Sequence, residues 1–334
     1  MSSLLLLASA ETPDLSMFDP VSPSAKSIRD LSILVMIITG LIFLVVEAVL
    51  CYCLLRFRRS TPGGNEPPQI YGSQPIEIAW SVAPALIVFM LVLITTRTLW
   101  EVNTDLPKPR ADDRALFVTV VGHQWWWEYI YESHDGRKLG FTTSNELHIP
   151  VGDDTARPVY LTLKSSDVCH SFWVPRLAGK TDLIPGRTNH TWFQTARPGL
   201  YLGQCAEYCG CQHANMLIRV VAEPIEDFER WLDHQQQPAV VEADLHVAQG
   251  AFLSQSCINC HRVRGTTAAG TFGPDLTHLM SRQTLASGMI PNTPENLRAW
   301  LVNPQNIKAG CLMPAFGLNK HDLDQIVDYL LVLR

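Results

Sequence analysis

Two long apolar runs, separated by a short polar segment, dominate the first hundred residues. Residues 33–55 are almost wholly apolar, and residues 76–99 form a second run of similar length with one charge before its end. Each run is long enough to cross a bilayer as an α-helix. The pattern therefore predicts a transmembrane hairpin over residues 31–100.

The segment between the runs indicates the orientation of this hairpin. It has the sequence RFRRSTPGGNEPPQIYGSQP and opens with three arginines at positions 56, 58 and 59. Short basic loops favour the cytoplasmic side, so both outer ends of the hairpin and the chain after residue 99 are expected outside. Basic residues on the outer flanks weaken this asymmetry. They are Lys26, Arg29, Arg97, Lys108 and Arg110.

Residues 1–30 precede the hairpin and are expected to be a leader or an extracytoplasmic segment. They begin MSSLLLLASA, and the Ala-Ser-Ala end resembles a secretory signal. However, no basic residue precedes the apolar run, which is shorter than usual. A signal peptide and a plain N-terminal segment both remain open.

Two acidic residues fall in the predicted helices. Glu47 lies well within the first, where a carboxylate is costly enough to indicate a function. A neutral or hydrogen-bonded Glu47 facing a partner subunit is an equally good interpretation. Glu77 lies at the cytoplasmic start of the second helix, where an ordinary interfacial acid is expected.

The pattern changes to short alternating runs over residues 110–232. ALFVTVV, PVYLTLKSS and NMLIRVV are typical of strands and are separated by turn residues. Several such strands predict a β-sandwich or Greek-key barrel. EPIEDFERWL then predicts a closing helix, and HQQQPAVVEA a polar linker.

A helical pattern occupies residues 244–334. TPENLRAWL combines a threonine cap with a proline at the first helical position. The last helix carries one apolar face, formed by Leu323, Ile326, Val327, Leu330 and Leu331. These features predict a small all-α domain.

Length and charge narrow the class of protein. The 334 residues exceed what one core usually holds, which agrees with several domains. A net charge of −6 gives no support to nucleic-acid binding. A mildly acidic surface suits a basic protein partner better.

The all-α region contains CINCH, the signature of covalent c-type haem attachment. Cys257 and Cys260 would bond the porphyrin, and His261 would reach the iron. A thioredoxin-like pair would need a βαβ unit, and a zinc site would need a second pair of ligands. Met313 is the expected sixth ligand, with Met280 and Met289 as alternatives; His/Met ligation is typical of electron carriers.

The all-β region contains CAEYCGCQHANM, which offers Cys205, Cys209, His213 and Met216. His170 lies upstream at the end of a predicted strand. Two cysteines and two histidines would also suit zinc. The thioether favours copper, and zinc would be a poor neighbour for an electron-carrying haem. A blue-copper site would use one cysteine, whereas two thiolates can bridge two coppers.

Longer motifs give the family. CAEYCGCQHANM, DVCHSFWVPRLAGKTDLIPGR and GHQWWWEY resemble subunit 2 of haem-copper cytochrome c oxidases, from the first helix to about residue 232. CINCH, FGPDL and MPAFG resemble class I cytochromes c, and the fusion resembles the caa3 type. The resemblance implies a multidomain membrane protein with a transmembrane hairpin, an all-β cupredoxin domain and an all-α class I cytochrome c domain.

The resemblance also assigns roles to single residues. It implies a binuclear CuA centre held by His170, Cys205, the carbonyl of Glu207, Cys209, His213 and Met216. It implies magnesium on the Glu207 carboxylate, electron entry at Trp125, and a supporting role for Pro274 beside His261. Glu77 matches the mouth of a proton pathway. Cys211 departs from the family pattern, and we expect it, like Cys169, to be a buried bystander.

The implied function is electron entry into a terminal oxidase of the bacterial inner membrane. Electrons from cytochrome c or a bc1-type complex would pass through haem c and CuA to haem a of subunit 1. There oxygen reduction would drive proton pumping, with subunit 3 in the same complex. This chain lacks the extra histidine set of an oxygen-reducing centre. Rival interpretations are a subunit of nitric oxide or nitrous oxide reductase and a thioredoxin-like copper chaperone.

Overall fold

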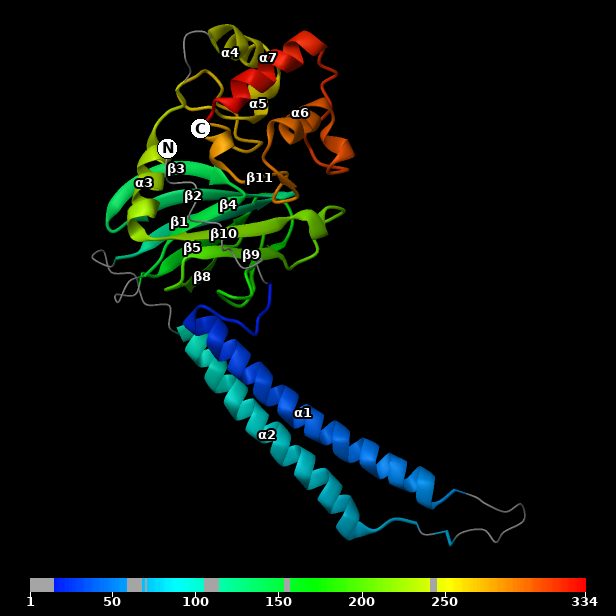
Figure 1. The fold of residues 1–334 in the computed structure, drawn as a ribbon. Helices are drawn as coiled ribbons and strands as arrows, with labels where there is room; N and C mark the ends of the chain where they lie inside the picture. The colour runs from blue at the N-terminus through cyan, green and yellow to red at the C-terminus, as the bar shows by residue number, and fades with distance from the viewer. Residues whose placement is uncertain (1–14, 59–67, 70, 105–113, 153–156, 241–244) are drawn as a thin grey trace. The chain divides into compact units, whose positions relative to one another are not determined.

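The computed structural model describes residues 15–58, 68–69, 71–104, 114–152, 157–240 and 245–334. The chain divides into two compact units, residues 26–107 and the remainder. The smaller unit is dominated by α1 (Pro23–Arg56) and α2 (Gln74–Thr104), two long continuous helices (Figure 1). Both are long and apolar enough to cross a membrane, with mean hydropathies of 2.9 and 2.4. Their apolar side chains are exposed, as lipid-facing helices require.

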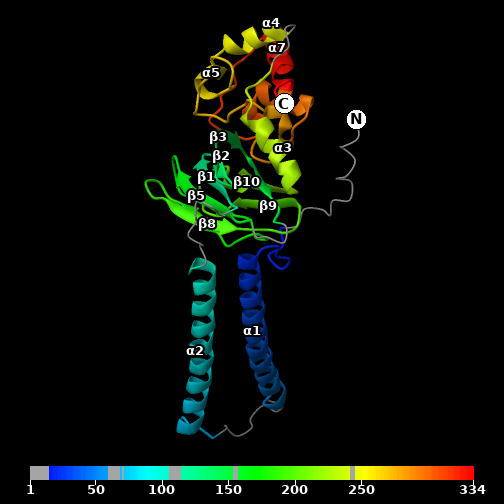
Figure 2. The same ribbon diagram turned by 90° about the vertical axis from the view of Figure 1, so that its left-hand side faces the viewer.

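The larger unit contains a β-sandwich whose two five-stranded sheets face each other (Figure 2). One sheet has the order β3-β2-β1-β5-β8, and the other β4-β10-β9-β6-β7. The strands are β1 (Leu116–His123), β2 (Trp126–His134), β3 (Arg137–Ser144), β4 (Glu146–Pro150), β5 (Val159–Ser165), β6 (His170–Trp173), β7 (Thr181–Leu183), β8 (Asn189–Phe193), β9 (Gly199–Cys205) and β10 (Leu217–Glu223). The β1/β5 and β4/β10 pairs are parallel and the other pairs are antiparallel.

The sandwich core follows from the alternation in the sequence. Leu116, Val118 and Val120 of β1 are buried, because alternate side chains of a strand point to the same face. Trp127 and Tyr129 of β2 are also fully buried in this core. Helix α3 (Ile225–Gln236) closes the sandwich with Phe228 and Leu232 buried against it, as EPIEDFERWL predicts.

A second hydrophobic core lies in the C-terminal region. It is built from α4 (His246–Leu253), α5 (Cys257–Cys260), α6 (Pro294–Val302) and α7 (Lys320–Leu331), with short helices η3 (Leu279–Ser281) and η4 (Pro304–Asn306). Thr293 caps α6 by accepting the amide hydrogen of Asn296, as predicted. The predicted apolar face of α7 packs into the core, with Leu331 partly buried.

The C-terminal region is not entirely helical. A short hairpin joins β11 (Thr284–Leu285) to β12 (Ile290–Pro291). Strands of two residues are too short to show a periodic pattern, so no sequence signal predicts them. The fold class predicted from the sequence, a helical hairpin followed by an all-β domain and an all-α domain, is confirmed, apart from this short hairpin in the C-terminal domain.

Candidate metal and haem sites

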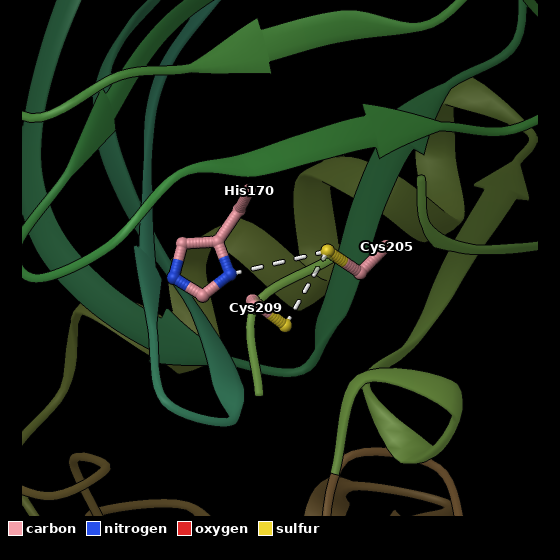
Figure 3. A group of neighbouring side chains, drawn as sticks. All are labelled: His170, Cys205 and Cys209. Atoms are coloured by element: carbon pink, nitrogen blue, oxygen red, sulfur yellow. Dashed lines mark hydrogen bonds between the residues drawn. The ribbon is translucent and has the colours of Figure 1, made fainter. Parts of the chain in front are cut away.

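Three buried side chains from separate segments of the sandwich meet at one point. His170 begins β6, Cys205 ends β9, and Cys209 lies in the loop that follows. Because β6 and β9 pair with Phe172 opposite Cys205, the histidine and the first cysteine are brought close. The Nδ1 of His170 lies 3.9 Å from the Sγ of Cys205, which lies 3.8 Å from the Sγ of Cys209 (Figure 3).

The other predicted copper ligands also lie beside the two sulfurs. The carbonyl oxygen of Glu207 is 3.2 Å from the Sγ of Cys205. On the other side, the Sγ of Cys209 lies 3.7 Å from the Nδ1 of His213 and 3.9 Å from the Sδ of Met216. Each sulfur is therefore flanked by its own imidazole and by one further donor.

The spacing of the sulfurs fits metal binding. A disulfide would join them at about 2.05 Å, so both are free thiols. Thiolate-metal bonds are about 2.3 Å, and two thiolates on one tetrahedral metal are then about 3.8 Å apart. The observed separation is 3.8 Å. Two thiols, two imidazoles and a thioether form a donor set that suits copper.

The two thiols are coupled through a hydrogen bond between their sulfurs. A hydrogen bond with Cys209 lowers the pKa of the Cys205 thiol to about 3, against the opposing effect of burial. The same hydrogen bond, together with burial, raises the pKa of Cys209. The pair therefore favours deprotonation of Cys205 over Cys209, and metal binding to both sulfurs would displace the remaining proton.

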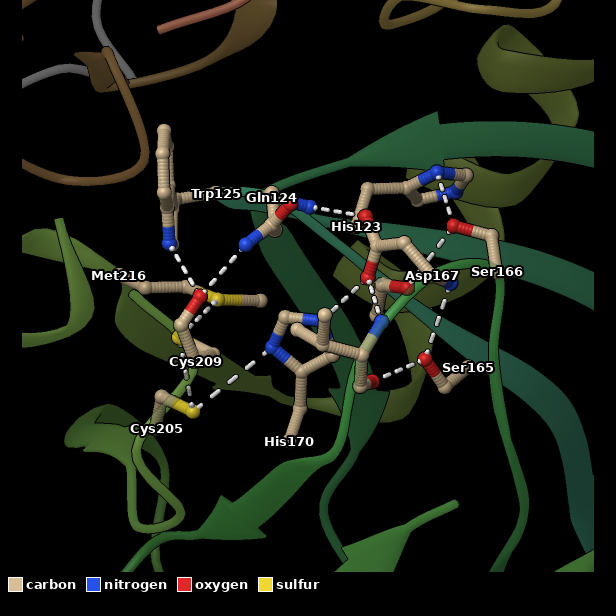
Figure 4. A network of polar contacts seen from close by, with 12 residues as sticks. His123, Gln124, Trp125, Ser165, Ser166, Asp167, His170, Cys205, Cys209 and Met216 are labelled. Atoms are coloured by element: carbon tan, nitrogen blue, oxygen red, sulfur yellow. Dashed lines mark hydrogen bonds and ion pairs between the residues drawn. The ribbon is translucent and has the colours of Figure 1, made fainter. Parts of the chain in front are cut away.

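Asp167 orients the His170 ring. Its Oδ1 lies 2.8 Å from the Nε2 of His170, which leaves Nδ1 facing Cys205 (Figure 4). Burial lowers the pKa of His170, but its hydrogen bonds with Asp167 and Cys205 outweigh burial and raise the pKa. Burial raises the pKa of Asp167, and hydrogen bonds from His170 and two backbone amides, those of Val168 and Gln124, lower it overall.

Gly122 leaves the space that the His170 ring occupies. An ideal Cβ built on Gly122 would lie 2.8 Å from the Cδ2 of His170, so any side chain there would displace the ring. The sequence reasoning missed both Asp167 and Gly122. The motif DVCH contains the available signal, an acid three residues before a ligand histidine.

Trp125 contacts the loop of the predicted copper ligands directly. Its Nε1 donates to the carbonyl of Cys209 at 2.9 Å, and the side-chain amide of Gln124 donates to the same oxygen at 2.7 Å. Trp125 is 8% exposed. Its role in electron entry stays a prediction. Its side chain lies beside Cys209, a predicted copper ligand (Figure 4).

The predicted haem-attachment residues line a mainly apolar cavity. Cys257, Cys260 and His261 contribute to its wall, and so does Met313. Among the residues that line this cavity, Met313 is present and the alternatives Met280 and Met289 are not. A c-type haem requires such an apolar space between a histidine and a methionine, so the described residues fit the group.

Backbone contacts hold His261 in position. Its Nδ1 lies 2.8 Å from the carbonyl of Pro274, so Nε2 would be available to a haem iron. An ideal Cβ on Gly273 would lie 2.7 Å from the Cε1 of His261, so glycine allows this close approach. Burial lowers the pKa of His261, which favours the neutral form that ligates metal.

The remaining predicted residues lie on the surface. The side chain of Glu207 is exposed, whereas its backbone carbonyl faces Cys205. The carboxylate therefore points to the surface and the carbonyl to the buried sulfurs. Glu77 is exposed in the first turn of α2, where its Oε1 accepts the amide hydrogen of Ser73. This contact is that of an ordinary first-turn acid.

Two cysteine predictions are wrong. Cys211 and Cys169 were expected to be buried, and both are exposed. Cys169 precedes the inward-facing His170, so its side chain points to the opposite side of the strand. Cys211 lies in the turn after Cys209, with its Sγ 3.8 Å from the carbonyl of Ala309.

Comparison with known proteins extends these observations to the entire chain. Residues 10–97 match the family model described as the transmembrane domain of cytochrome c oxidase subunit II. Residues 136–223 match its periplasmic domain, and residues 247–334 match cytochrome c.

Relatives of similar length carry the same name. Cytochrome c oxidase subunit 2 of Alkalihalophilus pseudofirmus is 36% identical over 99% of this chain and 94% of its own length. The Bacillus subtilis subunit 2 is 32% identical over 99% of this chain and 95% of its own length. A solved structure, the periplasmic domain of subunit II of cytochrome oxidase (CoxB) of Bradyrhizobium japonicum, is 31% identical. The match covers 38% of this chain and 96% of that domain, with a TM-score of 0.34. On this full-length similarity the chain belongs to the cytochrome c oxidase subunit 2 family, as a haem-copper oxidase subunit with a fused cytochrome c domain.

Proposed function

We propose that this chain passes electrons from an external donor, through a haem bonded to Cys257 and Cys260, to a binuclear copper centre. From there the electrons would continue to haem a of subunit 1. Bound haem and copper would supply reversible one-electron chemistry at the two ends of this path. The residues of the chain hold both groups, exclude water from them and connect them.

The position of Trp125 carries the proposal. This side chain lines the haem cavity and donates its indole hydrogen to Cys209, between the two predicted sites. A copper chaperone would not need such a connection. The arrangement of two imidazoles around two sulfurs supports two coppers, since each metal would have its own histidine.

The wider assignment follows from the family. We propose that α1 and α2 anchor the chain in the bacterial inner membrane, with the copper and haem domains on the periplasmic side. Subunits 1 and 3 would be its partners, and cytochrome c or a bc1-type complex its donor. The Glu207 carboxylate would bind magnesium at the contact with subunit 1, and Glu77 would lie at the entrance of a proton pathway.

Purification of the intact complex from its native membrane tests this function. Metal analysis should give two coppers in this chain and one covalently bound c-type haem, co-purifying with a haem-copper subunit. In rapid mixing with a reduced donor, haem c should be reduced before copper. A single labile copper without covalent haem, or the absence of a haem-copper partner subunit, would overturn the proposal.

A further inference from the structure

The β-sandwich and the C-terminal core meet through contacts that include two buried charged side chains. Lys308, from the C-terminal region, is 3% exposed, and Glu146, from β4, is 2% exposed. Lysine and glutamate are almost never fully buried unless they are paired. Their burial at this contact therefore indicates a specific docking arrangement.

Every donor of the Lys308 ammonium group has an acceptor. Its Nζ donates to the carbonyls of Trp125 at 2.8 Å, Asn215 at 2.9 Å and Ala286 at 3.0 Å. An ammonium group has three hydrogens, so this set satisfies it completely. Burial lowers the pKa of Lys308 to about 7, which reflects the cost of placing a cation here. The three carbonyls offset that cost.

The three carbonyls belong to segments with different roles. Trp125 lies in the turn between β1 and β2, and Asn215 precedes the predicted copper ligand Met216. Ala286 lies in the β11/β12 turn of the C-terminal region. Lys308 itself lies in the segment that leads to the predicted haem ligand Met313. One side chain thus connects the copper-binding and haem-binding loops.

Glu146 forms a second anchor at the same contact. Its carboxylate accepts the amide hydrogens of Gln283 and Thr284, at 2.9 Å in each case, and the Thr284 hydroxyl at 2.8 Å. Arg219 of β10 reinforces it by donating to the side chain of Gln283 at 2.7 Å. Both anchors therefore hold the segment around β11.

A third contact joins the two ligand-bearing loops themselves. The side-chain amide of Gln212 donates to the carbonyl of Ala309 at 2.7 Å. Gln212 lies between the predicted ligands Cys209 and His213, and Ala309 follows Lys308. Together these contacts fix the copper loop against the haem loop.

This docking makes the sandwich part of the haem cavity wall. Gln124, Trp125 and Trp126 line the cavity beside His261, and Lys308 lines it too. Electron tunnelling falls off exponentially with distance, so a small displacement of either loop would slow transfer. The side chain that sets this distance is expected to control the rate without touching either metal.

We propose that Lys308 is a positioning residue for electron transfer within the chain, because its three hydrogen bonds hold the haem-bearing domain against Trp125 and the copper loop. This inference rests on the proposed function. Glu146 supports the same docking from a site away from the haem loop.

The test measures internal electron transfer in the complete oxidase. Haem c is reduced by a photochemical reductant in solution, and the decay of reduced haem and the reduction of copper are followed optically. Lys308→Met should slow the internal step by about tenfold to a hundredfold, as expected for a misplaced reacting group. Haem reduction by the photoreductant, the haem potential and the near-infrared band of the methionine-ligated ferric haem should not change.

Lys320→Met is the matched control, because it removes the same charge from an exposed position of the same domain. It should transfer electrons at the wild-type rate. An unchanged internal rate in Lys308→Met, with an intact near-infrared band, would overturn the proposal.

Glu146→Gln keeps the test decisive if Lys308→Met disturbs the Met313 loop. It weakens docking without a contact to that loop and should also slow the internal step. If Glu146→Gln transfers normally, the docking proposal fails. If the wild-type protein itself shows no transfer from haem to copper, the proposed function fails instead.

Discussion

The indole nitrogen of Trp125 donates a hydrogen bond to the carbonyl oxygen of Cys209 at 2.9 Å. The backbone carbonyl of the same tryptophan accepts a hydrogen bond from Lys308 at 2.8 Å. The indole and the backbone carbonyl of this buried residue are therefore hydrogen-bonded to the predicted copper loop and to the predicted haem domain, respectively. This arrangement makes the indole N–H a specific target for mutation.

Trp125→Phe should slow electron transfer from haem to copper several-fold while leaving both groups bound. Phenylalanine keeps an aromatic ring in the cavity wall but removes the hydrogen bond to Cys209, at a cost of about 1 kcal/mol in stability. Photochemical reduction followed optically measures the rate. Trp126→Phe is the control, since Trp126 lines the same cavity but stacks on His123. Equal rates in both variants would argue against the Cys209 link.

Much of the fold was predictable because its signals are local. Apolar runs of membrane-spanning length, alternation in β1 and one apolar face in α7 each lie within a single element. Most of the candidate copper site was predictable for the same reason. Cys205, Cys209, His213 and Met216 lie in one short loop whose spacing brings them together.

The contacts that support these sites were not predictable, because they depend on tertiary pairing. Asp167 acts through its position beside the ring of His170, and Gln124 reaches Cys209 from the other sheet. Lys308 and Trp125 are 183 positions apart in the chain. A lone lysine carries no pattern, so the sequence could not distinguish Lys308 from a surface charge.

Asp167→Asn should weaken copper binding by about 10- to 100-fold, the usual effect of removing a partner behind a metal-bound histidine. Asparagine is uncharged and keeps only one acceptor oxygen, so it cannot accept from both His170 and the amide of Gln124 as the carboxylate does, and the His170 ring is held less firmly. Competition with a copper chelator measures the affinity. Asp182→Asn removes the same charge from β7, the strand paired with β6, and should bind copper normally. If Asp167→Asn bound copper as tightly as the wild type, Asp167 would have no orienting role.

Met313→Ala should leave the haem covalently attached but remove its sixth ligand. The near-infrared band of the ferric haem should disappear and the haem potential should fall, because a thioether favours ferrous iron. Optical redox titration measures both effects. Met280→Leu is the control, because Met280 packs against the hydrophobic core and is not among the residues that line the haem cavity. If Met280→Leu loses the band instead, the assignment of Met313 is wrong.

The β2/α3 contact should weaken in acid because of His134, whose side chain is 2% exposed. Its Nε2 lies 3.0 Å from a carboxylate oxygen of Glu229. Burial lowers the pKa of His134 below its ordinary value of 6.5, although Asp135 and Glu229 oppose this shift. The unfolded chain therefore takes up the proton first. Stability is complete above pH 6.5 and declines as the pH falls below it, until the folded form also binds the proton.

Amide hydrogen exchange in the intact, detergent-solubilised protein measures this decline as a loss of protection in β2. His134→Gln removes the titrating group, so its protection in β2 should depend less on pH than that of the wild type. His190→Gln changes an exposed histidine of β8 and should retain the wild-type pH dependence. If β2 in His134→Gln loses protection as steeply as in the wild type, another group governs the acid sensitivity of this contact.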